Sequence, residues 1–298
     1  MRPRRLSQQA GRHALVDGIP FTLPVASRNT PALMAAFRCN LDRAREALPG
    51  NELHPLNFFG SGLFLVTVVN YRDTNIGKYI EYSLAIACTH GARPAPFGLP
   101  FLFQQTFGVG QYVVDLPVST KISVKGGKGI WGMPKHQASL DFLVSDTTVS
   151  SQYNLDDRLV TRIDIARPTG WSIPLNLGAA NYCAFRGMLM KSYIYFKGDV
   201  RMALFGGARA QLTLGDHPRA EPLKRLQIER NPIFTAYFDQ TAGVLDDHFE
   251  SWFLSSAQAS TTRPEGMESV IDLPLDETWP PAPRPIPAGG APPPPTRG

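Results

Sequence analysis

The stretch from residue 63 to residue 165 alternates between apolar and polar side chains in short segments that turn residues separate. Tyr79–Ala87 is the clearest segment, with Ile80, Tyr82 and Leu84 on one face and Glu81 among small residues on the other. A period of two is that of a β-strand. Other strands are expected at 63–69, 111–116, 119–124, 139–144, 148–153, 159–165, 182–190, 193–196, 208–214 and 233–239. Such a series of strands, without alternating helices, predicts a mainly β (α+β) chain with antiparallel sheet.

Helices are expected at two places. Thr30 and Pro31 supply a capping oxygen and a residue suited to the first helical position. Apolar residues then recur at helical spacing until Pro49 and Gly50, which predicts a helix over 31–48. A second, short helix is expected at 221–227.

The two ends of the chain differ in composition from its middle. Residues 1–18 are polar and basic, and we expect them to be loosely ordered. Residues 276–298 become rich in proline, which predicts a disordered tail that is either a spacer or a ligand for an SH3-like partner. Residues 19–275 are then interpreted as a single domain.

Composition argues against several classes of protein. Hydrophobic residues make up 43% of the chain, which is enough for a large core, and the net charge of +5 involves no basic run interleaved with aromatics. Nucleic-acid binding is therefore not expected. The sequence has no run of eighteen apolar residues and no apolar segment behind its basic start, so we expect neither a membrane span nor a secretory signal.

Cysteine and histidine usage bears on redox compartment and on metals. Cys39, Cys88 and Cys183 are far apart and lack metal-ligand spacing, and no histidines pair at ligand spacing. Buried free thiols in a reducing, cytoplasmic setting are the simplest interpretation. We therefore expect no metal site, and nothing in the sequence suggests nicotinamide or flavin binding.

One lysine stands in surroundings unusual for its type. Lys135 follows a run of glycines, Trp131, Met133 and Pro134, and alternating apolar residues come after it. An amine in apolar surroundings loses the hydration that favours its charged form, and the uncharged amine can attack a carbonyl to form a Schiff base. We interpret Lys135 as such a nucleophile, with Trp131 and Met133 as its apolar wall. The alternative is a strand-edge lysine in a Gly/Pro turn.

Tyr79 and Glu81 are the candidate partners of this lysine. They lie two residues apart on one expected strand, so both side chains point to the same face. A carboxylate there suits general acid–base work. The alternatives are a solvated strand face for Glu81 and a packed aromatic ring for Tyr79.

Three stretches, in order along the chain, resemble the acetoacetate decarboxylase family. Residues 127–135 are similar to its Schiff-base lysine motif, 77–81 to its glutamate-bearing strand, and 210–218 to a further common stretch. The likeness extends over roughly residues 20–250. It implies a curved antiparallel β-barrel-like fold with a few peripheral helices, homo-oligomers, and imine chemistry in which the lysine replaces any metal or organic cofactor.

The chain departs from the family pattern around these residues. His136 stands where the decarboxylases have a second lysine, Gly129 where they have a glutamate, and Leu65 to Thr67 where a second acid is expected. The resemblance assigns substrate binding to Arg28, which would hold the substrate carboxylate, and to His136. If the strand is regular, however, His136 points away from the face that carries Lys135.

The sequence therefore predicts a lyase that decarboxylates a β-keto acid or related keto acid through Lys135, with Glu81 and Tyr79 handling protons. An aldolase–dehydratase that uses the same lysine on a keto acid and an aldehyde is the alternative. A protein of the same fold that binds an apolar ligand without catalysis is the second alternative.

Overall fold

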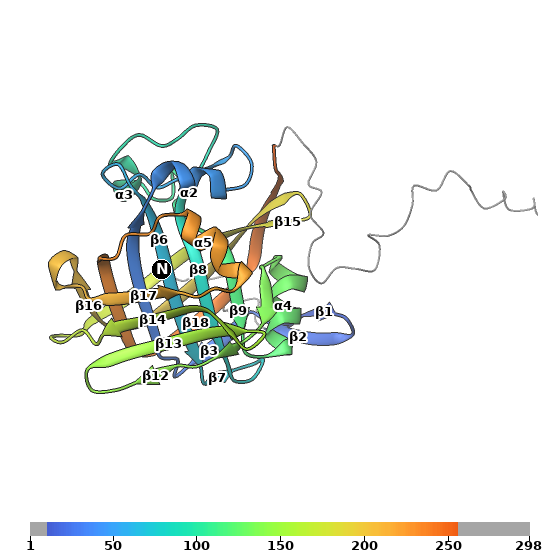
Figure 1. The fold of residues 1–298 in the computed structure, drawn as a ribbon. Coiled ribbons are helices and arrows are strands. Elements are labelled where there is room, and N and C mark those ends of the chain that lie inside the picture. Colours follow the sequence, from blue (N-terminus) through green and yellow to red (C-terminus); the bar gives the residue numbers. More distant parts are fainter. Residues whose placement is uncertain (1–10, 256–298) are drawn as a thin grey trace, which may run out of the picture. The chain divides into compact units, whose positions relative to one another are not determined.

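The computed structural model describes residues 11–255. The predicted proline-rich tail, 276–298, lies outside the described residues. The largest sheet closes on itself, so that its strands surround a barrel interior (Figure 1). The barrel strands, in their spatial order, are β9 (Gly110–Val118), β15 (Ile173–Phe185), β16 (Met188–Leu204), β18 (Pro232–Phe253), β4 (Ala32–Cys39), β6 (Gly62–Tyr71) and β8 (Tyr79–His90).

Closure comes from the pairing of β8 with β9. Most neighbours are antiparallel, as expected, but β9 runs parallel to β15. The short strands at the barrel edges are β3 (Val25–Arg28), β5 (Leu53–Pro55), β7 (Asp73–Thr74) and β10 (Lys135–Gln137). The mainly β, barrel-like architecture predicted from the sequence is confirmed.

A second sheet lies against the barrel. Its strands are β11 (Ser139–Leu140), β12 (Leu143–Val144), β13 (Thr148–Leu155), β14 (Arg158–Ala166) and β17 (Ala210–Leu214), and a separate hairpin is formed by β1 (Arg12–Val16) and β2 (Ile19–Leu23). The helical segments are α2 (Leu41–Ala47), α3 (Leu99–Leu102), α4 (Lys121–Trp131), α5 (Glu221–Arg225), η1 (Phe205–Gly207) and η2 (Pro218–Ala220).

Successive side chains of β6 point alternately to two different spaces, the main core and the barrel interior. Phe64 and Val66 are fully buried and pack in a core that also contains Tyr153 and Ile163 of the second sheet. Leu65, Thr67 and Val69, on the opposite face, line a cavity inside the barrel. The main core therefore fills the gap between the two sheets, which leaves the barrel interior available for a ligand.

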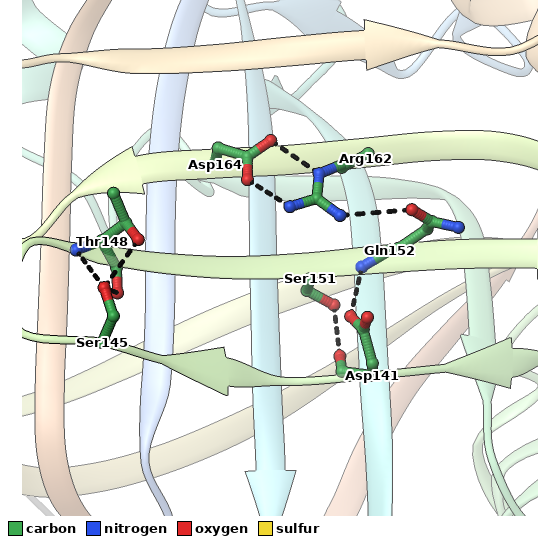
Figure 2. Close-up of polar contacts among 7 residues, drawn as sticks. All are labelled: Asp141, Ser145, Thr148, Ser151, Gln152, Arg162 and Asp164. Carbon is green, nitrogen blue, oxygen red and sulfur yellow. Dashed lines mark hydrogen bonds and ion pairs between the residues drawn. The ribbon is translucent and has the colours of Figure 1, made fainter.

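The other face of the second sheet carries polar contacts across its strands (Figure 2). Arg162 forms an ion pair with Asp164 at 2.7 Å and donates a hydrogen bond to Gln152 at 3.3 Å. The backbone N–H of Gln152 donates to Asp141 at 2.6 Å. A strand with one apolar face and one polar face fits a sheet that covers the core from outside.

Several expected elements differ from those observed. The predicted helix over 31–48 is wrong, because Ala32–Cys39 form a barrel strand and only Leu41–Ala47 are helical. A strand buried on both faces carries apolar residues at nearly every position, and such a run also fits a helical period. Residues 119–124 were expected to form a strand and instead enter α4.

Two further expectations concern chain direction and order. The strand expected over 182–190 is two strands, because residues 186–187 form a turn between β15 and β16. We expected residues 1–18 to be loosely ordered, whereas Arg12–Val16 form a hairpin strand against Ile19–Leu23. The short helix expected at 221–227 is observed as α5. Within residues 11–255, no helix is both long and apolar enough to cross a membrane.

The three cysteines are free and buried, as the sequence suggested. Burial, with a smaller effect of the Glu229 charge, raises the pKa of the Cys39 thiol to about 11. Burial raises the pKa of Cys183 to about 12. Their thiolate forms are therefore scarce in the folded protein near neutral pH.

We predict that the native protein does not react with a thiol-specific disulfide reagent near pH ~8, close to the ordinary thiol pKa. Unfolding in denaturant should expose all three thiols and bring their reactivity to that of a free cysteine. The absorbance of the released chromophore measures both states. Rapid reaction of even one native thiol would contradict the burial of these side chains.

Candidate active site

Lys135 is positioned by a reversal of the chain around α4. The helix begins directly after β9 and ends at Gly132, whose left-handed φ of 65° turns the chain back. β10 then pairs parallel with β9, with Lys135 beside Leu116. Lys135, which its sequence neighbours mark as a candidate nucleophile, is thus held at the barrel wall by a short strand.

Gly127 explains part of the glycine-rich run before the lysine. A Cβ atom built on Gly127 would lie 2.3 Å from Cδ of Lys135 and 2.7 Å from its Cε. Such distances are far inside van der Waals contact. The helix therefore needs a residue without a side chain here, so that the lysine can pass along it into the barrel.

Glu81 forms an ion pair with this lysine inside the barrel. Its Oε2 is 2.6 Å from Nζ of Lys135, and the two side chains are only 16% and 6% exposed. Nζ also donates a hydrogen bond to Oγ of Ser123 at 3.0 Å. The pairing of β8 and β10 with β9 creates this geometry, because Glu81 lies opposite Val118 and Lys135 opposite Leu116, two residues apart on β9.

Two buried tyrosines adjoin the ion pair. Tyr71 ends β6 and lies opposite Tyr79, the first residue of β8, and their rings stack at 4.4 Å. Nζ of Lys135 lies 5.4 Å from the centre of the Tyr79 ring. Burial first, and then the charge of Glu81, raise the pKa of each phenol well above its usual value. Both hydroxyls therefore keep their protons at neutral pH and can act as hydrogen-bond donors.

The ion pair lies at the wall of a cavity of about 410 Å³ inside the barrel. Lys135 and Glu81 are the charged side chains among the described residues that line it. Most of the other lining side chains are apolar and come from β4, β6, β9, β15, β16 and β18: Ala32, Met34, Leu65, Val69, Val113, Leu116, Leu177, Ala180, Ile194, Phe196, Phe238 and Leu245. A mostly apolar cavity with a few convergent polar groups is typical of a site for a small molecule.

A family comparison agrees with this arrangement. The model of the acetoacetate decarboxylase (ADC) family matches residues 8–166, a little more than half of the 298 residues. The chain belongs to the acetoacetate decarboxylase family. The matched range includes Glu81 and Lys135. No curated protein sequence gave a match.

Solved structures in this family share the fold. The acetoacetate decarboxylase of Legionella pneumophila subsp. pneumophila str. Philadelphia 1 is 16% identical, over 75% of this chain and 85% of that one, with a TM-score of 0.55. MppR, an enduracididine biosynthesis enzyme complexed with pyruvate, is 14% identical over 76% and 90%, with a TM-score of 0.54. An acetoacetate decarboxylase-like enzyme from Sphingomonas wittichii RW1 is 14% identical over 78% and 94%, with a TM-score of 0.51.

The other residues predicted to belong to the site lie in different places. Met133 lines the cavity. Trp131 is buried behind the wall, where it packs with Met133 and donates a hydrogen bond to the backbone oxygen of Asp246 at 2.8 Å. Arg28 is exposed at the end of β3, and it is not among the lining residues, so the expected contact with a substrate carboxylate has no support in this geometry.

His136 faces away from the cavity, as alternation along the strand predicted. Its Nε2 lies 2.8 Å from the hydroxyl of Tyr153, and its Nδ1 lies 3.4 Å from Oδ1 of Asp115. Tyr153 belongs to the second sheet and donates to Asp115 at 3.2 Å. His136 therefore joins the barrel to the second sheet, and a contact with substrate, which we had assigned to it, does not fit its position.

Two residues of the site, Tyr71 and Ser123, were not predicted from the sequence. Tyr71 continues the alternation of Leu65, Thr67 and Val69, so extending the expected strand by two residues would have placed it on the cavity face. Ser123 was not predicted because its segment was expected to be a strand, whereas its contact with Lys135 depends on the helical geometry of α4. Among residues 11–255, no three acidic, histidine or cysteine side chains gather as metal ligands would.

We predict that Gly127→Ala destabilises the protein by roughly 1–3 kcal/mol, because the added methyl overlaps the lysine side chain. In an ordinary helix position the same change would stabilise by about 0.5–1 kcal/mol. Thermal and urea unfolding measure the difference. The control is Lys121→Ala, at an exposed position of α4. A higher stability for Gly127→Ala would contradict the close packing of Lys135 on this helix.

Proposed function

We propose that the protein is a Schiff-base-forming lyase that decarboxylates a β-keto acid or related keto acid through Lys135. The observation that carries this proposal is the buried contact of 2.6 Å between Nζ of Lys135 and Oε2 of Glu81 at the wall of an apolar cavity. A buried amine beside a buried carboxylate has both a nucleophile and a group that can take its proton. Membership of the acetoacetate decarboxylase family supports the same chemistry.

Glu81 manages the protons of imine formation in this proposal. It accepts a proton from Nζ of Lys135, and the free amine attacks the substrate carbonyl to give a carbinolamine. The protonated Glu81 then returns the proton to the carbinolamine oxygen, which leaves as water. The product is a protonated imine, which restores a positive charge beside the Glu81 carboxylate.

The imine then serves as the electron acceptor. In a β-keto acid the carboxylate is attached to the carbon next to the imine carbon. This carbon–carboxylate bond breaks, carbon dioxide leaves, and its electron pair forms the C=C bond of an enamine while the C=N pair moves to the imine nitrogen. The apolar wall assists because a carboxylate there is poorly hydrated, whereas carbon dioxide and the enamine are uncharged. Protonation of the enamine carbon and hydrolysis release the ketone and regenerate Lys135.

A second candidate is aldol and dehydration chemistry with the same lysine. Tyr71 and Tyr79 favour it, because their buried hydroxyls keep their protons and lie beside Glu81. Such donors suit the oxygen of an incoming aldehyde. MppR, which shares the fold, has been crystallised with the condensation product of pyruvate and imidazole 4-carboxaldehyde. Release of carbon dioxide without an added aldehyde would favour decarboxylation over this alternative.

We predict that borohydride traps a ketone or keto acid on Lys135. The protein is incubated with acetoacetate, pyruvate or a simple ketone, reduced, digested and analysed by mass spectrometry. Lys135→Arg should abolish the adduct, whereas Lys121→Arg, at an exposed position of α4, should not. An adduct that persists in Lys135→Arg, or none with any carbonyl compound, would leave the non-catalytic ligand-binding alternative in place.

We also predict that Glu81→Gln slows formation of this adduct by about 10²–10⁴-fold, the usual contribution of a general acid–base group. Glutamine keeps the shape of the side chain but cannot take the proton of Lys135. Time-resolved quenching with borohydride gives the rate. Glu46→Gln, at an exposed position of α2, is the matched control. An unchanged rate in Glu81→Gln would remove this residue from proton transfer, provided that circular dichroism shows a folded variant.

A further inference from the structure

The charges that line the cavity limit what can fill it. Lys135 and Glu81 pair with each other, and no other charged side chain of the described chain lines the cavity. Arg28, which was expected to hold a carboxylate, lies outside. Burying an unpaired charge is costly, so a ligand with a second ionised group far from the lysine would lose affinity.

The cavity is also long in the direction of the strands. Along β6 its wall runs from Val69, which lies opposite Glu81, to Leu65, four residues away. At about 3.3 Å per residue this is roughly 13 Å from the level of the ion pair. Met34 on β4 lies opposite Thr67 in the middle of this wall, and both line the cavity. A three- or four-carbon keto acid would occupy less than half of such a length.

The far end of the cavity has polar side chains without charge. Gln111 on β9 lies five residues from Leu116, the residue that pairs with Lys135, which corresponds to about 16 Å along the strand. Its Nε2 donates a hydrogen bond to Oδ1 of Asn181 at 2.7 Å, and both residues line the cavity with Gln104. Amides of this kind accommodate a neutral hydroxyl, carbonyl or amide group, and supply no countercharge.

We propose that the substrate of Lys135 is a ketone or keto acid on an extended, uncharged, apolar chain. The carbonyl lies at Lys135, the chain follows β6 past Thr67 and Met34, and a neutral polar terminus, where present, meets Gln111 and Asn181. This inference rests on the proposed function for its chemistry. Its claim about chain length and charge concerns the cavity itself and can be tested separately.

The test uses the wild-type protein and a series of probes. Acetone, undecan-2-one and the ω-hydroxyl and ω-carboxylate derivatives of undecan-2-one are trapped on Lys135 with borohydride across a range of concentrations. Each buried methylene adds roughly fourfold in affinity, so undecan-2-one should half-saturate at a concentration at least about 100-fold below that of acetone. The ω-hydroxyl derivative should half-saturate at a concentration close to that of undecan-2-one. The ω-carboxylate derivative should need a concentration at least about tenfold higher.

Equal half-saturation by acetone and undecan-2-one, or strongest trapping of the ω-carboxylate, would overturn the inference while leaving the imine chemistry intact. Undecan-2-ol has no carbonyl and cannot form an imine, so calorimetry with this alcohol measures binding of the chain without the imine chemistry. If undecan-2-ol binds and no ketone is trapped, the proposed function fails and the apolar, chain-binding site stands. If it fails to bind, the inference is overturned whatever the chemistry.

A variant that fills the cavity away from the lysine gives an independent check. Leu65→Trp should raise the half-saturating concentration of undecan-2-one at least about tenfold more than that of acetone, because only the longer chain reaches that position. If Leu65→Trp does not fold, Met34→Phe carries the same expectation from the neighbouring strand. Equal effects on both ketones in a folded variant would contradict the proposed path of the chain.

Discussion

The ion pair between Lys135 and Glu81 is the constraint on which the rest of the site depends. Removing two charges from water costs several kcal/mol per ion, and only close, well-held geometry offsets this cost. Strand pairing supplies that geometry, since β9 lies between β8 and β10 and brings Val118 and Leu116 to one face. Breaking the pair from one side would leave a buried charge, which typically costs about 3–5 kcal/mol. The barrel interior can therefore be apolar elsewhere and still hold two charges.

The helix before Lys135 explains why the sequence there is rich in glycine. The glycines there suggest a turn, yet Gly126, Gly127 and Gly129 lie inside α4. Gly127 leaves room for the methylenes of Lys135, and Ser123, one turn earlier on the same helix, accepts a hydrogen bond from Nζ. Glycine in a helix is unfavourable by about 0.5–1 kcal/mol. This cost arises where the helix must lie close to the side chain of Lys135.

The parts of the fold that the sequence predicted are those with a clear period. β8 has Glu81 and small residues on its cavity face and larger apolar residues on the other, so its alternation survives in the sequence. β4 is buried to a similar degree but is apolar on both faces, and it was mistaken for a helix. Lys135, Glu81 and Tyr79 were found because they combine a motif with strand spacing. Tyr71 and Ser123 depend on which strands become neighbours and on a helix that begins directly after β9, and local pattern does not contain this information.

β10 shows why the residue after Lys135 can change while the position of the lysine stays fixed. A strand of three residues is too short to hold its own position. His136 binds Tyr153 of the second sheet and lies near Asp115 of β9, so the face of β10 opposite the cavity is fixed to both layers. Arg219 contacts the same Asp115 at 3.3 Å, which adds the segment after β17 to this anchor. The family resemblance places a second lysine at this position, whereas in this chain His136 anchors the strand. Glu81 is then the charged side chain that contacts the Lys135 amine within the cavity.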